Sequence, residues 1–389
     1  MPKIIRITTV PMALRYLLPG QMRFMKENGF EVVMISADGK ELTDVIQNEE
    51  CRHIIVPMTR KITPFKDLKC LRQLIKILKK ERPDIVHTHT PKAGILGMLA
   101  AKYSGVKVRI HTVAGLPMMV EKGWKYDLLR YVEQRTYKAA TNIWPNSNSL
   151  RQFLLKEKMV DPKKVSVIGK GSSNGIDLDQ FNRKSLDSDT LEKTKALINY
   201  SREKTYLLFI GRLVKDKGIP ELVNVFTFLR SKYKDLELLL VGDFEGTLDP
   251  LPEKTLNEIK TNPAIIHIPW SDDVKYFMAI ASCFVFPSHR EGFPNVLLQA
   301  GAMELPIVCS KITGNVDVVD HFQSGLIFDS GDEKQLAEQL IFAIEKPTAM
   351  KVFAEKLKAT IEQNFRRENI WQNMLSAYKS LLNSEAKSN

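Results

Sequence analysis

Short runs of apolar and β-branched residues alternate with longer helical patterns along the whole of this 389-residue chain. This alternation is typical of parallel sheets in which a helix follows each strand. In the first half the predicted strands are Ile4–Val10, Glu31–Ser36, Ile54–Pro57, Asp84–His87, Val108–Thr112, Asn142–Trp144 and Val165–Ile168. In the second half they are Tyr206–Ile210, Leu236–Val241, Ile265–Ile268, Cys283–Phe286, Pro306–Cys309 and Leu326–Phe328. The pattern therefore predicts an α/β fold class.

The alternation fails between residues 170 and 200, where Gly169-Lys-Gly-Ser-Ser-Asn-Gly-Ile-Asp precedes a polar segment. Such a segment is typical of a linker, and the chain is too long for one ordinary core. We expect two doubly wound, Rossmann-like domains facing a cleft. The first spans 1–185, the second spans 186–366, and a helix at about 367–389 packs back on the first. Ligands of such sheets bind beyond the carboxyl ends of the strands, which places the expected site at the cleft.

The composition excludes several protein classes. A hydrophobic content of 44% with 26% charged residues is that of a soluble globular protein. No apolar run approaches the roughly 20 residues that span a bilayer. Lys3 and Arg6 interrupt the N-terminal apolar stretch, which therefore reads as a first strand and not as a signal peptide. The four cysteines are scattered without C-x-x-C spacing, which favours reduced thiols and a cytoplasmic protein.

The net charge of +12 is divided unevenly along the chain. Residues 1–184 hold 33 Lys+Arg against 17 Asp+Glu, giving +16, and the remainder holds 24 against 28, giving −4. A basic excess confined to the first half predicts an anionic partner there, such as a membrane surface, a phosphorylated acceptor or nucleic acid. For any single lysine, a solvated surface position is the simpler interpretation.

The first functional motif is Phe209-Ile-Gly-Arg-Leu-Val-Lys-Asp-Lys-Gly218. An apolar strand ends at Gly211, a short loop carries Arg212 and Lys217, and a helix is expected from Ile219. Glycine allows close approach of a ligand to the backbone, and two cations at a strand's carboxyl end suit a diphosphate. Surface exposure is the simpler interpretation of Lys215.

The second motif is Phe286-Pro-Ser-His-Arg-Glu-Gly-Phe-Pro-Asn-Val-Leu-Leu-Gln-Ala-Gly-Ala-Met303. A buried strand leads into a loop with Glu291 and Gly292, and a helix is expected from Pro294-Asn295. Free N–H groups and the positive dipole end of that helix suit a phosphate. Glu291, just before the helix, can accept hydrogen bonds from sugar hydroxyls. A plain strand–helix unit with a helix cap would not explain this carboxylate.

These two motifs, followed by a Gly-x-Pro-Val-like strand, resemble the retaining glycosyltransferases of family four, which have the GT-B fold. The resemblance covers the whole chain and is most specific across 206–328. It implies that Arg212 and Lys217 contact the donor diphosphate, that Glu291 binds the transferred sugar, and that Gly211 belongs to the donor site. It further assigns donor contacts to Pro269, Trp270, Gly292, Phe293, Pro294 and Asn295, with Pro269 and Trp270 beside the nucleobase. The resemblance also implies retention of configuration, with the leaving diphosphate helping to deprotonate the acceptor.

One residue departs from the family pattern. The family often carries a second glutamate that binds the donor ribose, where this chain has Gln299. A glutamine carbonyl still accepts a hydrogen bond, but without the strength of a charged carboxylate. Metal-dependent transferases use Asp-x-Asp, and both matches, at 177–179 and 187–189, fall in the expected linker. We therefore expect no metal and no cofactor, with Arg212, Lys217 and a helix dipole offsetting the leaving-group charge.

The acceptor is expected in the first half. Asp84-Ile-Val-His-Thr-His-Thr-Pro-Lys-Ala-Gly94 ends a strand at His89 and opens a helix through Thr90 and Lys92, which suits an acceptor phosphate. His111, at the next strand end, resembles an active-site histidine of related transferases. His87 is interpreted as structural. The predicted catalytic set is Arg212, Lys217, Glu291 and His111, and the predicted acceptor set is His89, Thr90, Lys92 and His111.

The segment Lys66–Arg82 predicts an amphipathic helix. Its apolar side faces the core, and its other side carries Lys69, Arg72, Lys76, Lys79 and Lys80. Each such cation contributes on the order of 1 kcal/mol near an anionic membrane. A lipid-linked acceptor would explain why the basic excess lies in this half. The helix therefore predicts peripheral binding to the inner face of the plasma membrane.

The sequence thus predicts a glycosyltransferase, hexosyl- or N-acetylhexosaminyl-, acting from a nucleotide-sugar donor, expected to be a UDP-sugar. The expected acceptor is a glycan on polyprenyl diphosphate in polysaccharide assembly. Two alternatives remain open at this point. A non-hydrolysing UDP-sugar 2-epimerase shares the two-domain architecture but needs no acceptor. A basic nucleic-acid-binding protein would fit a sequence pI near 9.3, although no nucleic-acid-binding module is visible.

Overall fold

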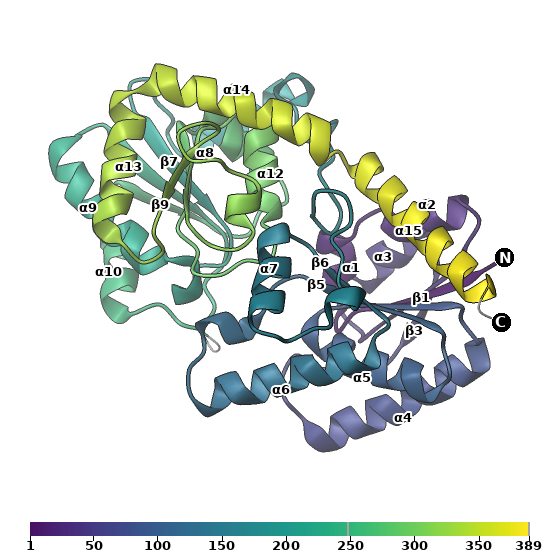
Figure 1. The fold of residues 1–389 in the computed structure, drawn as a ribbon. Coiled ribbons are helices and arrows are strands. Elements are labelled where there is room, and N and C mark those ends of the chain that lie inside the picture. Colours follow the sequence, from purple (N-terminus) through teal and green to yellow (C-terminus); the bar gives the residue numbers. More distant parts are fainter. Residues whose placement is uncertain (247–248, 388–389) are drawn as a thin grey trace. The chain divides into compact units, whose positions relative to one another are not determined.

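The computed structural model describes residues 1–246 and 249–387. Within them the chain forms two compact units. Unit 1 runs from Met1 to Gly175 and resumes at Arg367, and unit 2 comprises Ile176–Arg366. The first unit ends inside the glycine-rich segment of the expected linker. Figure 1 shows that each unit has its own sheet with helices around it.

Unit 1 is built on a parallel six-stranded sheet with the order β3-β2-β1-β4-β5-β6. Its strands are β1 Lys3–Ile7, β2 Glu31–Ser36, β3 Arg52–Ile55, β4 Ile85–His89, β5 Val108–Val113 and β6 Asn142–Pro145. Its helices are α1 Pro11–Leu17, α2 Gln21–Glu27, α3 Leu42–Glu49, α4 Pro64–Glu81, α5 Pro91–Tyr103, α6 Trp124–Ala139, α7 Asn148–Lys156 and α15 Arg367–Lys387. Short 3-10 turns lie at η1 Pro117–Val120 and η2 Pro162–Lys164.

Helices cover both faces of this sheet. Side chains of α4, α5, α6 and α7 pack on one face, beside Ile5 and Ile7 of β1. Side chains of α1, α2, α3 and α15 pack on the other face, beside Ile4. Both cores are apolar, because a parallel sheet buried on two sides needs apolar residues on both.

Unit 2 repeats the design with the order β12-β11-β10-β7-β8-β9. Its strands are β7 Thr205–Ile210, β8 Leu236–Val241, β9 Ile265–Ile268, β10 Cys283–Phe286, β11 Ile307–Ser310 and β12 Leu326–Phe328. Its helices are α8 Ser188–Leu197, α9 Ile219–Lys232, α10 Glu253–Thr261, α11 Val274–Ile280, α12 Asn295–Ala302, α13 Glu333–Glu345 and α14 Pro347–Asn364. Its 3-10 turns are η3 Arg183–Ser185, η4 Lys215–Lys217 and η5 Asn315–Asp317.

The α/β fold class predicted from the sequence is confirmed, but one of the predicted strands does not form. The predicted strand Val165–Ile168 is wrong, because this segment makes only an isolated bridge from Val165 to Ile143 of the edge strand β6. The chain then turns at Gly169 and Gly171, whose φ angles are +58° and +114°. Positive φ values are incompatible with extended strand geometry, so the segment cannot continue as a strand past Ile168.

Helix α15 is tied to unit 1 by buried polar contacts. The Tyr378 hydroxyl lies 2.5 Å from Nδ1 of His87, whose other ring nitrogen lies 2.7 Å from the Thr112 hydroxyl. Trp371 donates its indole N–H to Oδ1 of Asn174 at 2.6 Å. Residues 388–389 of the expected C-terminal helix lie outside the described residues. Among the helices that the structure describes, none is both long and apolar enough to cross a membrane.

Candidate active site

The sheet order of unit 2 marks one position as the expected ligand site. From the central strand β7 the chain passes to β8 and β9 on one side and then returns to β10 on the other. The loops after β7 and β10 therefore diverge at the carboxyl edge, where open α/β sheets bind ligands. These two loops carry the motifs predicted from the sequence, so the topology brings both motifs to one place.

A glycine lets these loops approach each other closely. Gly218 ends the loop after β7 with φ +70°, and a Cβ there would clash with the carbonyl oxygen of Pro287. A larger residue would force the loops apart and would also be strained at this φ angle. The close approach positions the side chains described next.

Lys217 and Glu291 form an ion pair between the two loops. Both side chains are largely buried. Ser288 donates its hydroxyl to the same carboxylate oxygen of Glu291 at 3.0 Å. Lys217 Nζ also lies 5.4 Å from the centre of the Phe286 ring. A paired cation and carboxylate thus stand at the expected ligand position, and both were predicted as site residues.

Asp216 makes four contacts, three of them with the loop after β10. Its backbone N–H donates to the Asp249 carboxylate at 2.7 Å. Its carbonyl oxygen accepts from the backbone N–H of His289 at 2.9 Å and lies 3.3 Å from the Ser288 hydroxyl oxygen. Its carboxylate lies 2.6 Å from Nε of Arg290. Asp216 therefore holds its neighbour Lys217 opposite Glu291, a role that the sequence analysis missed.

His289 fixes the second loop from its other side. Nε2 lies 2.9 Å from the carboxylate of Glu221, in the first turn of α9, and Nδ1 lies 3.0 Å from the Ser330 hydroxyl. The hydrogen bond to Glu221 raises the pKa of His289. The only sequence signal for this contact is a histidine two residues before Glu291.

Arg212, Pro269 and Trp270, which were also predicted to bind the donor, lie on the same edge of the sheet but contact residues other than Lys217 and Glu291. Arg212 pairs with Glu245, which follows β8, and its side chain is about half exposed. Pro269 and Trp270 are exposed and follow β9. The Trp270 backbone N–H donates to the Asp243 carboxylate at 3.0 Å. The structure thus brings Lys217 to Glu291 and leaves Arg212 and Trp270 apart from that pair.

The segment from Gly292 to Asn295 connects the loop after β10 to helix α12. Pro294 is the N-cap residue and Asn295 begins the helix. The Phe293 ring is buried and packs on Phe365, with ring centres 5.3 Å apart. Its side chain therefore supports the core, and the donor role of this segment stays a prediction. Gln299 lies half-buried in the second turn of α12.

In unit 1 the equivalent position lies after β1 and β4, where the side chains of Thr9, His89 and Thr90 carry no charge. His89 ends β4 and is 1% exposed, and among the described residues neither of its ring nitrogens has a hydrogen-bond partner. Burial lowers the pKa of His89 well below its usual range, so the ring is neutral. Thr90 follows with φ +82° and ψ 145°, near a region almost confined to glycine. Its hydroxyl lies 2.7 Å from that of Thr9.

Two other predicted acceptor residues have partners within unit 1. Lys92 lies 2.7 Å from the carboxylate of Asp67 in α4, which offsets its charge. His111 is buried under α5, with Nδ1 2.8 Å from the Thr88 hydroxyl, and burial lowers its pKa to about 3. A Cβ on Gly94 of α5 would lie 2.5 Å from the His111 ring, so this glycine leaves room for it. The acceptor roles of Lys92 and His111 stay predictions.

The acidic tripeptides of the linker have local contacts. The Asp177 carboxylate accepts the N–H groups of Asp179 and Gln180 at 3.1 and 3.0 Å. Asp187 caps α8 by accepting the Thr190 N–H at 2.7 Å. Within the described part of the chain, no three His, Cys, Asp or Glu side chains are grouped to hold a metal ion.

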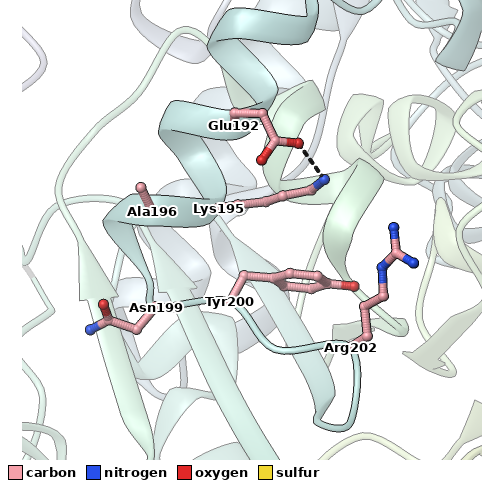
Figure 2. Close-up of a pocket in the computed structure, with 6 residues that line it drawn as sticks. All are labelled: Glu192, Lys195, Ala196, Asn199, Tyr200 and Arg202. Atoms are coloured by element: carbon pink, nitrogen blue, oxygen red, sulfur yellow. Dashed lines mark hydrogen bonds and ion pairs between the residues drawn. The ribbon is translucent and has the colours of Figure 1, made fainter.

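The depression drawn in Figure 2, about 470 Å³ in volume, is a poor match to the predicted site. It is lined by α8 and the segment that follows it, including Tyr200. The Tyr200 ring stacks on Tyr206 at the start of β7, with ring centres 5.2 Å apart. The depression therefore lies at the amino end of that strand, opposite the edge where ligands bind.

Comparison with known proteins gives the family. The sequence model described as "Glycosyl transferases group 1" matches residues 192–365, and the model described as "Glycosyl transferase 4-like" matches residues 9–147. The chain is 36% identical over 387 residues to the capsular polysaccharide biosynthesis glycosyltransferase CapM of Staphylococcus aureus, covering 99% of each. It is 28% identical over 324 residues to an Escherichia coli UDP-Gal:α-D-GlcNAc-diphosphoundecaprenol α-1,3-galactosyltransferase, covering 82% of each.

A solved structure shows the same fold. HepE of Anabaena, crystallised with UDP and glucose, superposes with a TM-score of 0.80 at 15% identity, covering 98% of this chain and 100% of HepE. The chain is therefore a glycosyltransferase with the GT-B fold and belongs to the group 1 glycosyltransferase family.

Proposed function

We propose that this enzyme transfers a hexosyl or N-acetylhexosaminyl group from a UDP-sugar to a glycan on polyprenyl diphosphate, with retention of configuration, during polysaccharide assembly. The observation that carries the proposal is the Lys217–Glu291 pair at the carboxyl edge of unit 2. It supplies a cation for a diphosphate and a carboxylate for sugar hydroxyls. The Escherichia coli relative is named for a UDP-galactose donor and a diphosphoundecaprenol-linked acceptor, which supports both substrate classes.

Donor binding exchanges one set of contacts for another. The β-phosphate takes the Lys217 ammonium from Glu291, and the released carboxylate accepts hydrogen bonds from the sugar hydroxyls. The start of α12, where no side chain caps the helix, adds a positive dipole end for the phosphate. Arg212 leaves Glu245 to join the diphosphate. These cations offset the leaving-group charge, so the proposed reaction needs no metal ion.

The acceptor binds in unit 1, beside His89 and Thr90. The neutral, unpartnered imidazole of His89 offers a hydrogen bond to an acceptor group, and leaving it unmade in a buried site is costly. The start of α5 follows directly and suits an acceptor phosphate. Because Asp67 offsets the charge of Lys92, we assign that lysine a supporting role.

The proposed transfer step needs no protein nucleophile. The acceptor hydroxyl oxygen bonds to the anomeric carbon on the face from which the diphosphate leaves. The bond from that carbon to the phosphate oxygen breaks, and the hydroxyl proton passes to an oxygen of the departing UDP. Lys217 stabilises the developing charge on that UDP.

A donor screen on the full chain tests the proposal. Nucleotide release from a set of nucleotide sugars is measured with a synthetic polyprenyl-diphosphate-linked sugar, and the product's anomeric configuration is read by NMR. We expect release from a UDP-sugar only with the acceptor present, an unchanged anomeric configuration, and full activity in excess EDTA. An inverted product, or loss in EDTA with rescue by magnesium or manganese, would contradict the mechanism. Isomerisation of the donor without an acceptor would favour the epimerase alternative.

Peripheral membrane binding belongs to the same proposal. On α4 the side chains of Cys70, Leu74 and Leu78 face the core. The opposite side carries exposed cations at Lys69, Arg72, Lys76 and Lys79. These positions suit anionic headgroups, which would bring the enzyme to a lipid-linked acceptor.

A further inference from the structure

Large apolar side chains are exposed at the starts of two helices of unit 1. Phe65 is 93% exposed, Ile62 is 70% exposed and Trp124 is 71% exposed. Together with their neighbours they form what we call the apolar rim, comprising Ile62, Phe65, Leu68, Val120, Trp124 and Leu128. Scattered apolar residues are normal on a surface, but two such groups at corresponding helix ends indicate a contact surface.

The topology places the rim beside the proposed acceptor site. In a parallel sheet, each connecting helix begins at the carboxyl edge, because it follows the end of its strand. Helix α4 follows β3 and α6 follows β5, with α5 packed between them (Figure 1). Lys92 near the start of α5 contacts Asp67 near the start of α4. The rim therefore flanks the start of α5, which follows His89 and Thr90.

Charged and aromatic residues identify the partner. Exposed lysines accompany the rim at Lys61, Lys66, Lys69, Lys122 and Lys125. The nearby acids are Asp67, paired with Lys92, Glu121, 4.0 Å from Lys125, and the exposed Asp127. Farther along α6, Tyr131 is exposed, with the Arg135 guanidinium 4.7 Å from its ring centre. Apolar and aromatic side chains bordered by lysines match the interface of an anionic bilayer.

We propose that the apolar rim inserts into the headgroup region of an anionic membrane. The inserted starts of α4 and α6 hold the carboxyl edge of unit 1 against the bilayer. A polyprenyl diphosphate then reaches the start of α5 while its hydrocarbon chain stays in the membrane. This inference rests on the proposed lipid-linked acceptor. It differs from docking by the basic side of α4 because apolar insertion, and not charge alone, sets the orientation.

Vesicle co-sedimentation of the full chain tests the rim directly. Vesicles of phosphatidylcholine with phosphatidylglycerol are compared with phosphatidylcholine alone, at low and physiological salt. Phe65→Ser should weaken partitioning to the anionic vesicles about tenfold or more, since it removes a large exposed apolar side chain that the proposal places in the bilayer. The matched control is Phe228→Ser in α9 of unit 2, a phenylalanine that is 65% exposed, and it should bind like the wild type.

A second readout locates the rim in the bilayer. Lipids brominated on the acyl chain near the headgroup should quench the tryptophan fluorescence of the wild type, and Trp124→Phe should lose most of that quenching. Equal binding by Phe65→Ser and Phe228→Ser would overturn the inference, as would quenching unchanged in Trp124→Phe. Dimerisation of the wild type that is abolished in Phe65→Ser, measured by ultracentrifugation without lipid, would assign the rim to a second copy of the chain.

A short-chain, water-dispersed acceptor separates this inference from the proposed function. Phe65→Ser should keep wild-type turnover on that acceptor and lose turnover on a long-chain acceptor in vesicles. If the wild type transfers sugar to the short acceptor but does not bind vesicles, the rim inference fails and the proposed function stands. If the wild type binds vesicles through the rim but transfers no sugar, the proposed function fails and the rim inference stands.

Discussion

Units 1 and 2 share one strand order but carry different side chains where that order reverses. In unit 2 the loops after β7 and β10 hold the charged pair Lys217 and Glu291. In unit 1 the loops after β1 and β4 hold the uncharged Thr9, His89 and Thr90. The topology decides where a ligand can bind, and the side chains decide which ligand binds. The charged position suits a nucleotide diphosphate, and the neutral one suits hydrogen bonding to an acceptor.

The interiors of the two units also differ, but not in the same sense as their ligand positions. The described strand β8 of unit 2 is buried along its whole length and consists mostly of leucine. In unit 1, Arg6 of β1 is buried and hydrogen-bonds Gln21, which in turn donates to the Ser173 carbonyl at 2.9 Å. Burial lowers the pKa of Arg6. Buried polar groups need such partners, so this network ties β1 to the segment before the unit boundary.

The charged position should be the more sensitive of the two. We expect Arg212→Ala and Lys217→Ala each to reduce turnover at saturating donor by at least about a hundredfold, the size of losing one charge-stabilising donor. Both proteins should stay folded, because both side chains lie on a loop. Lys215→Ala, an exposed lysine in the same loop, is the control and should remain near wild type. Near-wild-type turnover of either site variant would place the diphosphate elsewhere.

The variant Asp216→Asn tests whether the Lys217–Glu291 pair depends on the contacts between the loops after β7 and β10. Asp216→Asn removes the ion pair with Arg290 but retains the backbone contacts. Because small displacements of positioning groups are costly, the donor KM should rise about tenfold. The acceptor KM and the melting temperature should change little. A loss of stability without a change in donor KM would make Asp216 structural only.

His89 tests the uncharged position. His89→Ala should raise the acceptor KM about tenfold, the size of one lost hydrogen bond, and leave the donor Kd unchanged. Isothermal titration with UDP and steady-state kinetics with varied acceptor separate the two effects. His321→Ala, at an exposed histidine of unit 2, serves as the control. Weaker UDP binding by His89→Ala would remove the distinction between the units.

The smallest expected effect concerns the stability of unit 1 alone. Burial raises the pKa of Glu133 in α6 from 4.5 to about 7. Its protonated form therefore stabilises the fold fully below pH 4.5, and this contribution is lost as pH rises through about 7. Glu133→Gln, a neutral mimic, should raise the melting temperature by about 2–4 °C at pH 8 and change little at pH 4.5. A melting temperature that is unchanged at pH 8 would contradict the raised pKa.

The sequence by itself determined the helices and strands, and it determined that the two motifs lie at the carboxyl edge of the sheet. Strands such as Glu31–Ser36, Leu236–Val241 and Cys283–Phe286 match their predicted bounds, because a strand buried on both faces is a continuous apolar run. Helices begin at Ile219 and Asn295 as expected, since Pro220 and Pro294 favour a helix start. Motifs that follow strands then lie at the carboxyl edge in any parallel sheet.

Only the tertiary structure decided which side chains meet at that edge. The pairing of Lys217 with Glu291, the four contacts of Asp216 and the pairing of Lys92 with Asp67 join segments distant in the chain. All three depend on strand order, and the contacts of Lys217 and Asp216 depend also on the approach permitted by Gly218; local patterns carry no information on either. His111 shows the same limit. Its position in a strand was readable from the sequence, but its burial under α5 depends on the missing side chain of Gly94.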